Sequence, residues 1–307
     1  MKQSVFRVSL MMCAVLVSAA CDSGGQARTG DDVTIGLSLS TLDNPFFVAM
    51  KAGVEKAAAE LGASVIVLNA GNDASVQADQ VRTLTERRVG VIIINPVDSR
   101  QAKQAADIAQ AALVPLVSVD RSVYGGAVAS EVASDNVQGG ALAAIALGRA
   151  ANGNVVHLTG VAGASATYDR GTGFEQGLNS GGIRVVATRT ADFSRARAVQ
   201  VMTDLMRAGK NIEGVFADND EMALGAIEAL GARAGAEVQV VGFDGTPEAL
   251  GAVADGTMAA TVAQQPDLLG RNAVEQAVRA ARGEKVQQVV DVPVKVVTKD
   301  NAAAFRR

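Results

Sequence analysis

The feature that most constrains the fold is an alternation of short apolar runs with amphipathic segments, which runs along the chain twice. Short apolar runs between turn residues predict buried strands, and the longer amphipathic segments predict helices. The first series has the strands Val33 to Leu39, Ser64 to Leu68, Val91 to Ile94 and Leu116 to Val119, and the helices Pro45 to Leu61, Ser75 to Arg88 and Arg100 to Ala111. The second series, after Ser134, has the strands Val155 to Leu158, Ile183 to Thr188, Gly214 to Ala217, Val238 to Phe243 and Met258 to Ala263, and the helices Ala164 to Asn179, Arg195 to Ala208, Asp220 to Ala232 and Pro247 to Asp255. Two such series predict an α/β protein with two doubly wound parallel sheets.

The end of the chain must rejoin one of these domains. A helix from Leu268 to Arg282 and a terminal strand from Val286 to Val297 remain after the second series. Several crossings between the domains follow, and they make a hinge. Helix boundaries carry their usual signals, because Asn44 precedes Pro45 as a cap and Ser99 precedes the helix from Arg100.

The first residues are typical of a signal peptide that ends in a lipid-attachment site. Lys2 and Arg7 precede an apolar stretch from Val8 to Ala20, which is shorter than the about 20 residues that a comfortable membrane span needs. Small residues then lead into Cys21, as in the bacterial lipobox. We therefore exclude residues 1–20 from the fold and expect Cys21 to carry a lipid at the start of a flexible tether, residues 21–32.

Composition excludes several classes of function. A net charge of -4 and a pI near 5.2 give no basic face for nucleic acid, so no nucleic-acid partner is expected. Cys13 leaves with the signal peptide, which makes Cys21 the one cysteine of the mature chain and rules out an internal disulfide or a thiolate metal cluster. No phosphate-binding GxxxxGK[ST] loop occurs, and we expect no cofactor and no metal.

Polar residues directly follow several predicted strands. In open α/β sheets ligands bind beyond the carboxyl ends of the strands. The residues at those positions are Ser40 and Asn44, Asn95, Asp120 with Arg121, Asp218 with Asn219, and Asp244. Each one alone is compatible with an ordinary cap or turn. Together they suit the vicinal hydroxyls of a sugar, since amide, carboxylate and guanidinium groups make paired hydrogen bonds of fixed geometry.

Aromatic residues are scarce but recur at the same loops. Only 3% of residues are aromatic, yet Phe46 and Phe47 open a helix beside Asn44, and Phe193 lies in a strand-to-helix loop. A helix-start pair can be a simple core contact. Flat rings also cover the apolar C–H faces of a sugar ring, which favours a carbohydrate cleft.

A series of motifs resembles the D-ribose-binding proteins of the periplasmic binding protein type 1 family. The motifs lie in the family's order between residues 33 and 298: STLDNPFF (Ser40 to Phe47), INPVDS (Ile94 to Ser99), VDR (Val119 to Arg121), SDN (Ser134 to Asn136), RGTGF (Arg170 to Phe174), ADF (Ala191 to Phe193), NDEMALGA (Asn219 to Ala226), GFDGTP (Gly242 to Pro247) and AQQPD (Ala263 to Asp267). The sequence departs from the pattern at Asp43, Tyr168 and Pro293, none of which is a ligand-contact position.

The resemblance implies a set of ligand-binding residues in each domain. The N-terminal domain would contribute Ser40, Asn44, Phe46, Phe47, Asn95, Asp120 and Arg121, with Ser40 the least direct; the C-terminal domain would contribute Arg170, Phe193, Asn219, Asp244 and Gln264. It also implies three crossings, which would divide the chain into an N-terminal lobe of residues 33–134 and 265–293 and a C-terminal lobe of residues 135–264 and 294–307. The lobes would close on a sugar, D-ribose, without catalytic residues.

The same resemblance implies partners and a location. The chain would be a monomeric, extracytoplasmic binding subunit, held at a membrane only through its lipid, that delivers sugar to an ABC permease and its ATPase. A chemoreceptor is a further partner that the family allows. Alternative ligands on the same fold are D-allose, a galactofuranose or a furanosyl signal.

Two other classes of protein are less consistent with the residues. A sugar-responsive repressor of the lactose-repressor type needs an N-terminal helix-turn-helix, where this chain has a signal peptide. An enzyme needs an acid or base, but His157 lies in an apolar strand where a core or edge histidine is expected, and Arg121 offers Asp120 a structural partner.

Overall fold

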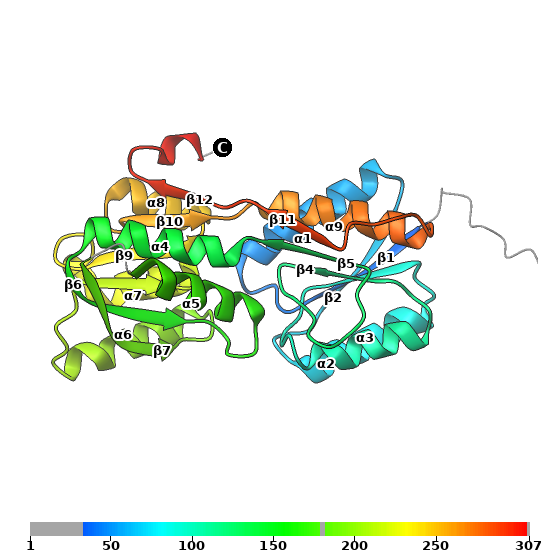
Figure 1. The fold of residues 1–307 in the computed structure, drawn as a ribbon, viewed down its shortest axis with the longest axis horizontal. Helices are drawn as coiled ribbons and strands as arrows, with labels where there is room; N and C mark the ends of the chain where they lie inside the picture. The colour runs from blue at the N-terminus through cyan, green and yellow to red at the C-terminus, as the bar shows by residue number, and fades with distance from the viewer. Residues whose placement is uncertain (1–32, 179–181, 306–307) are drawn as a thin grey trace, which may run out of the picture.

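The computed structural model describes residues 33–178 and 182–305, and in it the chain forms two α/β lobes that lie side by side (Figure 1). The first lobe contains the strands β1 (Thr34–Leu39), β2 (Ser64–Asn69), β3 (Val91–Ile94), β4 (Leu116–Val119), β5 (Ser130–Ser134) and β11 (Val289–Val292), and the helices α1 (Pro45–Glu60), α2 (Ala74–Glu86), α3 (Ala102–Ala111) and α9 (Pro266–Ala281). The second lobe contains β6 (Gly153–Thr159), β7 (Ile183–Thr190), β8 (Gly214–Ala217), β9 (Gln239–Asp244), β10 (Ala260–Ala263) and β12 (Lys295–Thr298), the helices α4 (Asn136–Ala150), α5 (Ser165–Gly177), α6 (Arg195–Arg207), α7 (Asp220–Leu230) and α8 (Pro247–Asp255), and the 3-10 turns η2 (Gly231–Arg233) and η3 (Ala302–Ala304).

Each lobe is a three-layer sandwich around one six-stranded sheet. The strand orders are β11-β5-β4-β3-β1-β2 and β12-β10-β9-β8-β6-β7, and every pair is parallel except β10 with β12. In the first lobe, α1 and α9 cover one face and α2 and α3 the other; in the second, α4 with α5 and α6 with α7 do the same. The predicted fold class of two doubly wound sheets is confirmed.

Three connections join the lobes (Figure 1): β5 to α4, β10 to α9, and β11 to β12. The last one corrects the sequence analysis, which expected a single strand from Val286 to Val297. Instead Val292 pairs with Ser134 in the first sheet and Lys295 pairs with Ala263 in the second. Pro293, which lacks an N–H for a ladder bond, lies at this break. The strand β5 and the helix α4 were not predicted.

Glycines in α4 and α5 allow these two helices to pack closely. A Cβ on Gly140 of α4 would lie 2.1 Å from the carbonyl oxygen of Arg170, and a Cβ on Gly173 of α5 would lie 1.9 Å from that of Val137. Only glycine permits such an approach of two backbones. The low helix propensity of glycine explains why the α4 segment has a weak helical pattern in the sequence. The close packing of α4 against α5 nevertheless fixes the position of α5, the helix that carries Arg170.

Candidate functional site

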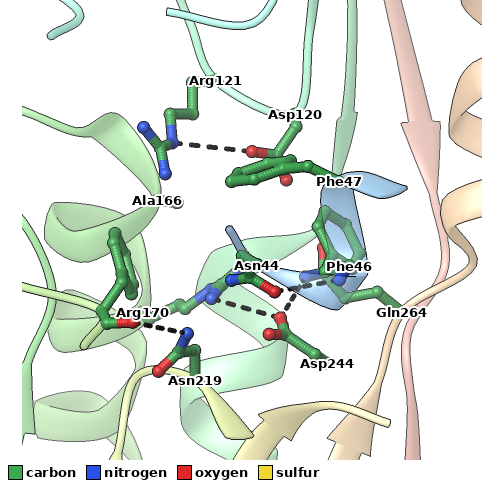
Figure 2. A pocket seen from close by; sticks show the side chains of 11 residues that line it. Asn44, Phe46, Phe47, Asp120, Arg121, Ala166, Arg170, Asn219, Asp244 and Gln264 are labelled. Atoms are coloured by element: carbon green, nitrogen blue, oxygen red, sulfur yellow. Dashed lines mark hydrogen bonds and ion pairs between the residues drawn. The ribbon is translucent and has the colours of Figure 1, made fainter. Parts of the chain in front are cut away.

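A small cavity lies between the lobes, beyond the carboxyl ends of both sheets (Figure 2). Its walls are formed by Asn44, Phe46, Phe47, Asp120 and Arg121 of the first lobe and by Ala166, Arg170, Phe193, Asn219, Asp244 and Gln264 of the second. The strand order of each sheet reverses here, so the crevices of two switch points face each other.

Asp120 and Arg121 follow β4 and form a buried ion pair. Asp120 has a φ of +67°, a left-handed conformation that directs the two successive side chains toward the cavity. Arg121 Nε lies 3.6 Å from Asp120 Oδ2, and Arg121 Nη1 donates to the carbonyl oxygen of Pro96 at 2.9 Å. Arg121 Nε is buried and has no hydrogen-bond partner within residues 33–178 and 182–305. The guanidinium therefore retains a donor for a ligand.

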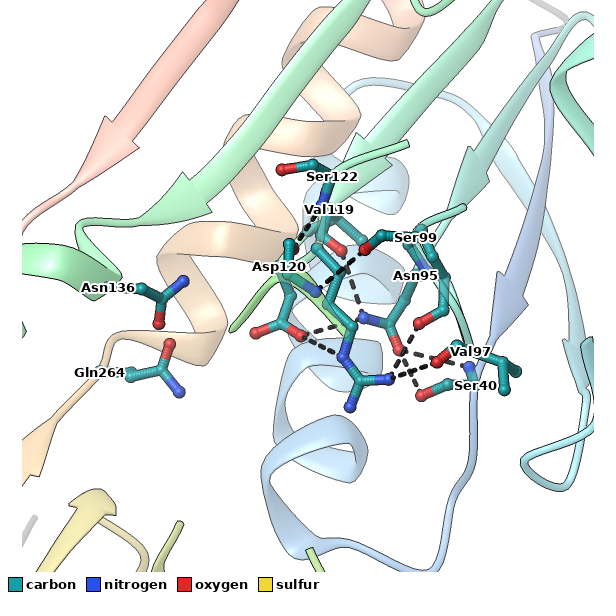
Figure 3. Close-up of polar contacts among 12 residues, drawn as sticks. Ser40, Asn95, Val97, Ser99, Val119, Asp120, Ser122, Asn136 and Gln264 are labelled. Atoms are coloured by element: carbon teal, nitrogen blue, oxygen red, sulfur yellow. Dashed lines mark hydrogen bonds and ion pairs between the residues drawn. The ribbon is translucent and has the colours of Figure 1, made fainter. Parts of the chain in front are cut away.

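A chain of hydrogen bonds behind the cavity holds the carboxylate of Asp120 (Figure 3). Asn95 Nδ2 donates to Asp120 Oδ2 at 3.0 Å and to the carbonyl oxygen of Val119 at 3.2 Å. Ser40 Oγ donates to Asn95 Oδ1 at 2.6 Å. Ser40 and Asn95 do not line the cavity, so the structure gives them a supporting position one layer behind it.

Arg170 projects from α5 and is fixed by groups of the second lobe. Its Nε donates to Asn136 Oδ1 at 2.9 Å, and its Nη1 donates to the carbonyl oxygen of Asp218 at 2.5 Å. The guanidinium carbon lies 3.8 Å from the ring centroid of Phe243. Asn136 begins α4 directly after the first connection between the lobes, so the position of Arg170 is tied to the hinge.

Asp244 and Gln264 form the floor of the cavity beside Arg170. Gln264 Nε2 donates to Asp244 Oδ1 at 2.7 Å, and Arg170 Nη1 lies 3.7 Å from the same oxygen. Gln264 Oε1 is buried and has no hydrogen-bond partner in the part of the chain that the structure describes. Asp244 has a φ of +129°, a rare conformation for a residue other than glycine. This group therefore presents both unused acceptors and a charge to the cavity.

The two carboxylates and two guanidiniums of the cavity carry no net charge when all are ionised, but burial opposes the charged forms of Asp120, Asp244 and Arg121. Burial raises the pKa of Asp120, against the opposing effect of Arg121. Burial raises the pKa of Asp244 well above its usual value, and Arg170 opposes that shift. Burial also lowers the pKa of Arg121. Hydroxyl groups that donate to these carboxylates and accept from the guanidiniums would replace the lost water, which is the chemistry of a neutral polyol.

Two asparagines at helix starts reach the cavity. Asn44 Oδ1 accepts from the backbone N–H of Phe46 at 2.9 Å, and Asn219 Oδ1 accepts from that of Met222 at 2.9 Å. Each oxygen thus caps its own helix, as the sequence predicts for Asn44. The cap fixes the side chain and leaves the amide end for other contacts; Asn219 Nδ2 makes one, at 3.4 Å, to the carbonyl oxygen of Phe193.

Aromatic rings from both lobes cover the cavity. The rings of Phe46 and Phe47 meet edge to face with centroids 5.4 Å apart. The guanidinium carbon of Arg121 lies 5.3 Å from the ring centroid of Phe47 and 5.3 Å from that of Phe193, so the cation lies between rings of opposite lobes. Phe193 has a φ of +57° and packs over Gly160, where a Cβ would lie 2.1 Å from the ring.

The structure brings together ten of the twelve residues that the sequence singled out; the other two, Ser40 and Asn95, stand directly behind them. Ala166 also lines the cavity and was missed, because an alanine at a helix start carries no chemical signal. Asn136, which holds Arg170, was not assigned a role, because the strand β5 before it was not predicted. Asp218 was among the polar residues expected after the strands, and the structure gives it a supporting position behind Arg170.

His157 lies away from the cavity surface and is 5% exposed. Its Nε2 lies 2.7 Å from Asp218 Oδ1, and its ring stacks on Phe216 with centroids 5.0 Å apart. It thus supports the residue whose carbonyl oxygen holds Arg170. In the described ranges 33–178 and 182–305, no group of three or more His, Cys, Asp or Glu side chains is arranged to hold a metal ion.

Comparison with known proteins gives a consistent result. A family model described as a periplasmic binding protein domain matches residues 35–285. The ribose import binding protein RbsB of Bacillus subtilis is 45% identical over 271 residues, which are 87% of this chain and 88% of that protein. RbsB of Salmonella typhimurium is 41% identical over 295 residues, 95% of this chain and 98% of that protein. An ABC transporter solute-binding protein of Bacillus halodurans, solved with bound myo-inositol, superposes with a TM-score of 0.85 at 32% identity, covering 91% of this chain and 99% of the other.

Proposed function

The chain belongs to the periplasmic binding protein family, type 1, and from this premise we propose that it binds D-ribose between its lobes as the substrate-binding subunit of an ABC sugar importer. Proteins of this family bind solutes for transport and are not enzymes. The observation that carries the proposal is the cavity itself, in which two carboxylates and two guanidiniums face one small space under the rings of Phe47 and Phe193.

The chemistry of the cavity suits a pentose. Asp120 and Asp244 can accept from hydroxyls, while Arg121, Arg170 and the asparagine amides can donate to them. Phe rings from both lobes can cover the C–H faces of the sugar ring. With about ten non-hydrogen atoms and up to about -1.5 kcal/mol for each, ribose can reach the roughly -8 kcal/mol of micromolar binding.

Ribose is favoured over other sugars by two observations. The most similar relatives given above are ribose import proteins, and all twelve residues of the ribose-binding pattern stand in this sequence. Buried groups that lose a complementary partner cost about 1–3 kcal/mol each, so a site built for ribose discriminates against sugars with different hydroxyl positions.

A second candidate keeps the fold and changes the ligand. The Bacillus halodurans protein superposes on this chain and holds myo-inositol, a different polyol. The alternative is therefore D-allose, a galactofuranose or a furanosyl signal in the same cavity. Recognition of the ligand-bound protein by a chemoreceptor is compatible with either ligand.

Binding would be coupled to lobe closure. The cavity takes its walls from both lobes, so a ligand gains its full set of contacts only in the closed form and shifts the population toward it. The closed form would then be recognised by a permease, and the ATPase would drive import. The division of the chain at its three connections fits this motion, with residues 33–134 and 265–293 in one moving body and 135–264 and 294–307 in the other.

We also propose an extracytoplasmic monomer anchored by a lipid on Cys21. Cys21 and the tether lie outside the described residues, so the sequence motif carries this part of the proposal. No helix within residues 33–178 or 182–305 is long and apolar enough to cross a membrane.

Calorimetric titration of the fragment from residue 30 onward tests the ligand. We expect one-to-one binding of D-ribose at micromolar or lower Kd and no heat from D-allose, D-galactose or D-xylose. If D-ribose gives no heat of binding and another sugar does, the fold assignment stands and the assignment of ribose as the ligand is wrong.

A further inference from the structure

Helix α5, which carries Arg170, begins without a capping side chain of its own. Six helices of the described ranges are capped by the residue that precedes them, namely by Asn44, Asp73, Asp135, Ser194, Asn219 and Thr246. Ala164 occupies this position in α5 and has no side-chain acceptor. The first N–H of the helix therefore needs an acceptor from elsewhere.

The other lobe supplies that acceptor. The backbone N–H of Ser165 donates to Ser99 Oγ at 3.0 Å, and Ser99 belongs to the loop after β3 in the first lobe. The sequence analysis placed Ser99 at the start of the following helix, but that turn is capped by Asp98 Oδ1, which accepts from Arg100 N and Gln101 N at 2.8 Å. The hydroxyl of Ser99 is thus directed to the helix of the opposite lobe.

Two further hydrogen bonds cross between the lobes at the same place. Ser122 N donates to Ser165 Oγ at 2.9 Å, and Ser99 N donates to the carbonyl oxygen of Gly163 at 2.8 Å. Ser99 is 0% exposed and Ser165 is 2% exposed, so water does not reach these groups in the closed form. Any separation of the lobes must break all three bonds.

These bonds connect the segments that carry the ligand contacts. Ser165 is followed by Ala166, and Arg170 lies on the same helix. Ser122 directly follows Arg121, whose side chain lies in the cavity. The serine contacts thus hold the positively charged groups of the two lobes at a fixed separation, and none of the three serines lines the cavity.

We propose that Ser99 and Ser165 are positioning residues that set sugar affinity, because only in the closed form does Ser99 complete the start of α5 and does Ser165 accept from Ser122 N. This inference rests on the proposed function of closure around a sugar. In an open form the N–H of Ser165 faces water, and closure exchanges water for the Ser99 hydroxyl. The contact therefore stabilises the closed form and leaves the fold of each lobe unchanged.

The main test compares Ser99→Ala with Ser118→Ala. Ser118 is an equally buried serine of the first lobe, and its hydroxyl has no partner in the ranges that the structure describes. Loss of a helix cap by Ser99→Ala should raise the Kd for D-ribose about tenfold, mainly through faster dissociation. Ser118→Ala should leave the Kd within about twofold of that of the unchanged protein.

The melting temperature of the unliganded protein separates a closure contact from a general structural one. Ser99→Ala should leave it unchanged and should lower the melting temperature of the sugar-bound protein. An equal decrease in melting temperature with and without sugar would overturn the proposal. A Kd of Ser99→Ala for D-ribose equal to that of Ser118→Ala would overturn it as well. Ser165→Ala, which removes the acceptor of Ser122 N, provides a second variant and should give the same pattern.

Amide exchange locates the effect and needs no variant. The N–H of Ser165 should exchange slowly with saturating sugar and rapidly without it, whereas core amides of β8 should be slow in both states. Binding of ribose by the unchanged protein tests the proposed function separately. If another sugar of the panel binds instead, the same comparisons apply with that sugar. If none binds, the proposed function fails, and slow exchange at Ser165 in the unliganded protein would overturn the inference as well, because the Ser99 contact would then not depend on closure.

Discussion

Arg121 Nε lies 3.6 Å from Asp120 Oδ2, just beyond hydrogen-bond distance, although both side chains are buried. The two charges balance without a mutual hydrogen bond, so Arg121 Nε, which has no hydrogen-bond partner among the described residues, remains free to donate to a ligand. Arg170 Nη1 and Asp244 Oδ1 lie 3.7 Å apart in a second such pair. Both pairs therefore present polar atoms to a common space, and this arrangement suits hydroxyl groups better than it suits a charged ligand.

The first prediction concerns Arg121. Its replacement by alanine removes a donor to the ligand and leaves Asp120 buried beside no neutralising partner on its own lobe, an arrangement that costs several kcal/mol in closed sites. We expect Arg121→Ala to raise the Kd for D-ribose by well over tenfold, measured by titration calorimetry, with an unchanged circular dichroism spectrum. Arg82→Ala, an exposed change on α2, serves as the control. An unchanged Kd for D-ribose would contradict the assignment of this cavity as the ligand-binding site.

The second prediction concerns how much Asn95 and Ser40, which lie behind the cavity, each contribute to ribose affinity. Asn95→Ala removes the hydrogen bond to Asp120 Oδ2 and should weaken ribose binding by roughly tenfold, since such bonds to charged groups are worth about 1.5–3 kcal/mol and water can replace part of this. Ser40→Ala should weaken it less, because Ser40 N still donates to Asn95 Oδ1 at 3.2 Å. A loss with Ser40→Ala as large as that with Arg121→Ala would show a direct ligand contact instead.

The third prediction concerns the pH dependence of stability. Burial raises the pKa of Asp220 from 3.8 to about 6, against hydrogen bonds from Thr261 and Thr246. Between these two values the folded state holds a proton that the unfolded state releases, so this group makes the free energy of unfolding fall as pH rises. Over the window the contribution is roughly 3 kcal/mol.

Asp220→Asn should remove that fall. We expect the difference in unfolding free energy between the original protein and the variant, from urea titrations between pH 4 and pH 7, to shrink as pH rises toward 6. The raised pKa of Asp244 also makes the free energy of unfolding fall as pH rises. Loss of the Asp220 charge removes one of the effects that raise the pKa of Asp244. An exposed change, Asp79→Asn, is the control. Parallel curves for Asp220→Asn and the original protein would contradict the assignment.

The fourth prediction concerns Cys21. A lipid on this residue would hold the protein at a membrane surface, so Cys21→Ala should move it to the soluble fraction after cell lysis. Cys13→Ala is a matched control, because Cys13 lies in the expected signal peptide and its replacement should not change the membrane-bound fraction. Membrane association of the Cys21→Ala protein would count against lipid anchoring.

Local pattern accounts for much of the fold and of the site. Val91 to Ile94 and Leu116 to Val119 are apolar runs that only a buried strand can use, and parallel strands place the residues after them at one edge. Asn95, Asp120 and Arg121 were found in this way. The strand 130–134 and the helix 136–150 were not, because alternating small residues and paired glycines give a weak periodic signal.

The sequence by itself determined which segments form strands and helices and which polar residues gather at the sheet edges, because burial and backbone preference are local properties of the chain. Only the tertiary structure decided which residues meet across the lobes. The hydroxyl of Ser99 accepts from the start of α5 and does not cap the helix that follows Ser99 in the chain. The strands Val289–Val292 and Lys295–Thr298 belong to different sheets. The guanidinium of Arg121 lies between the rings of Phe47 and Phe193. These contacts depend on the relative orientation of two lobes joined by three connections, and no local pattern encodes that orientation.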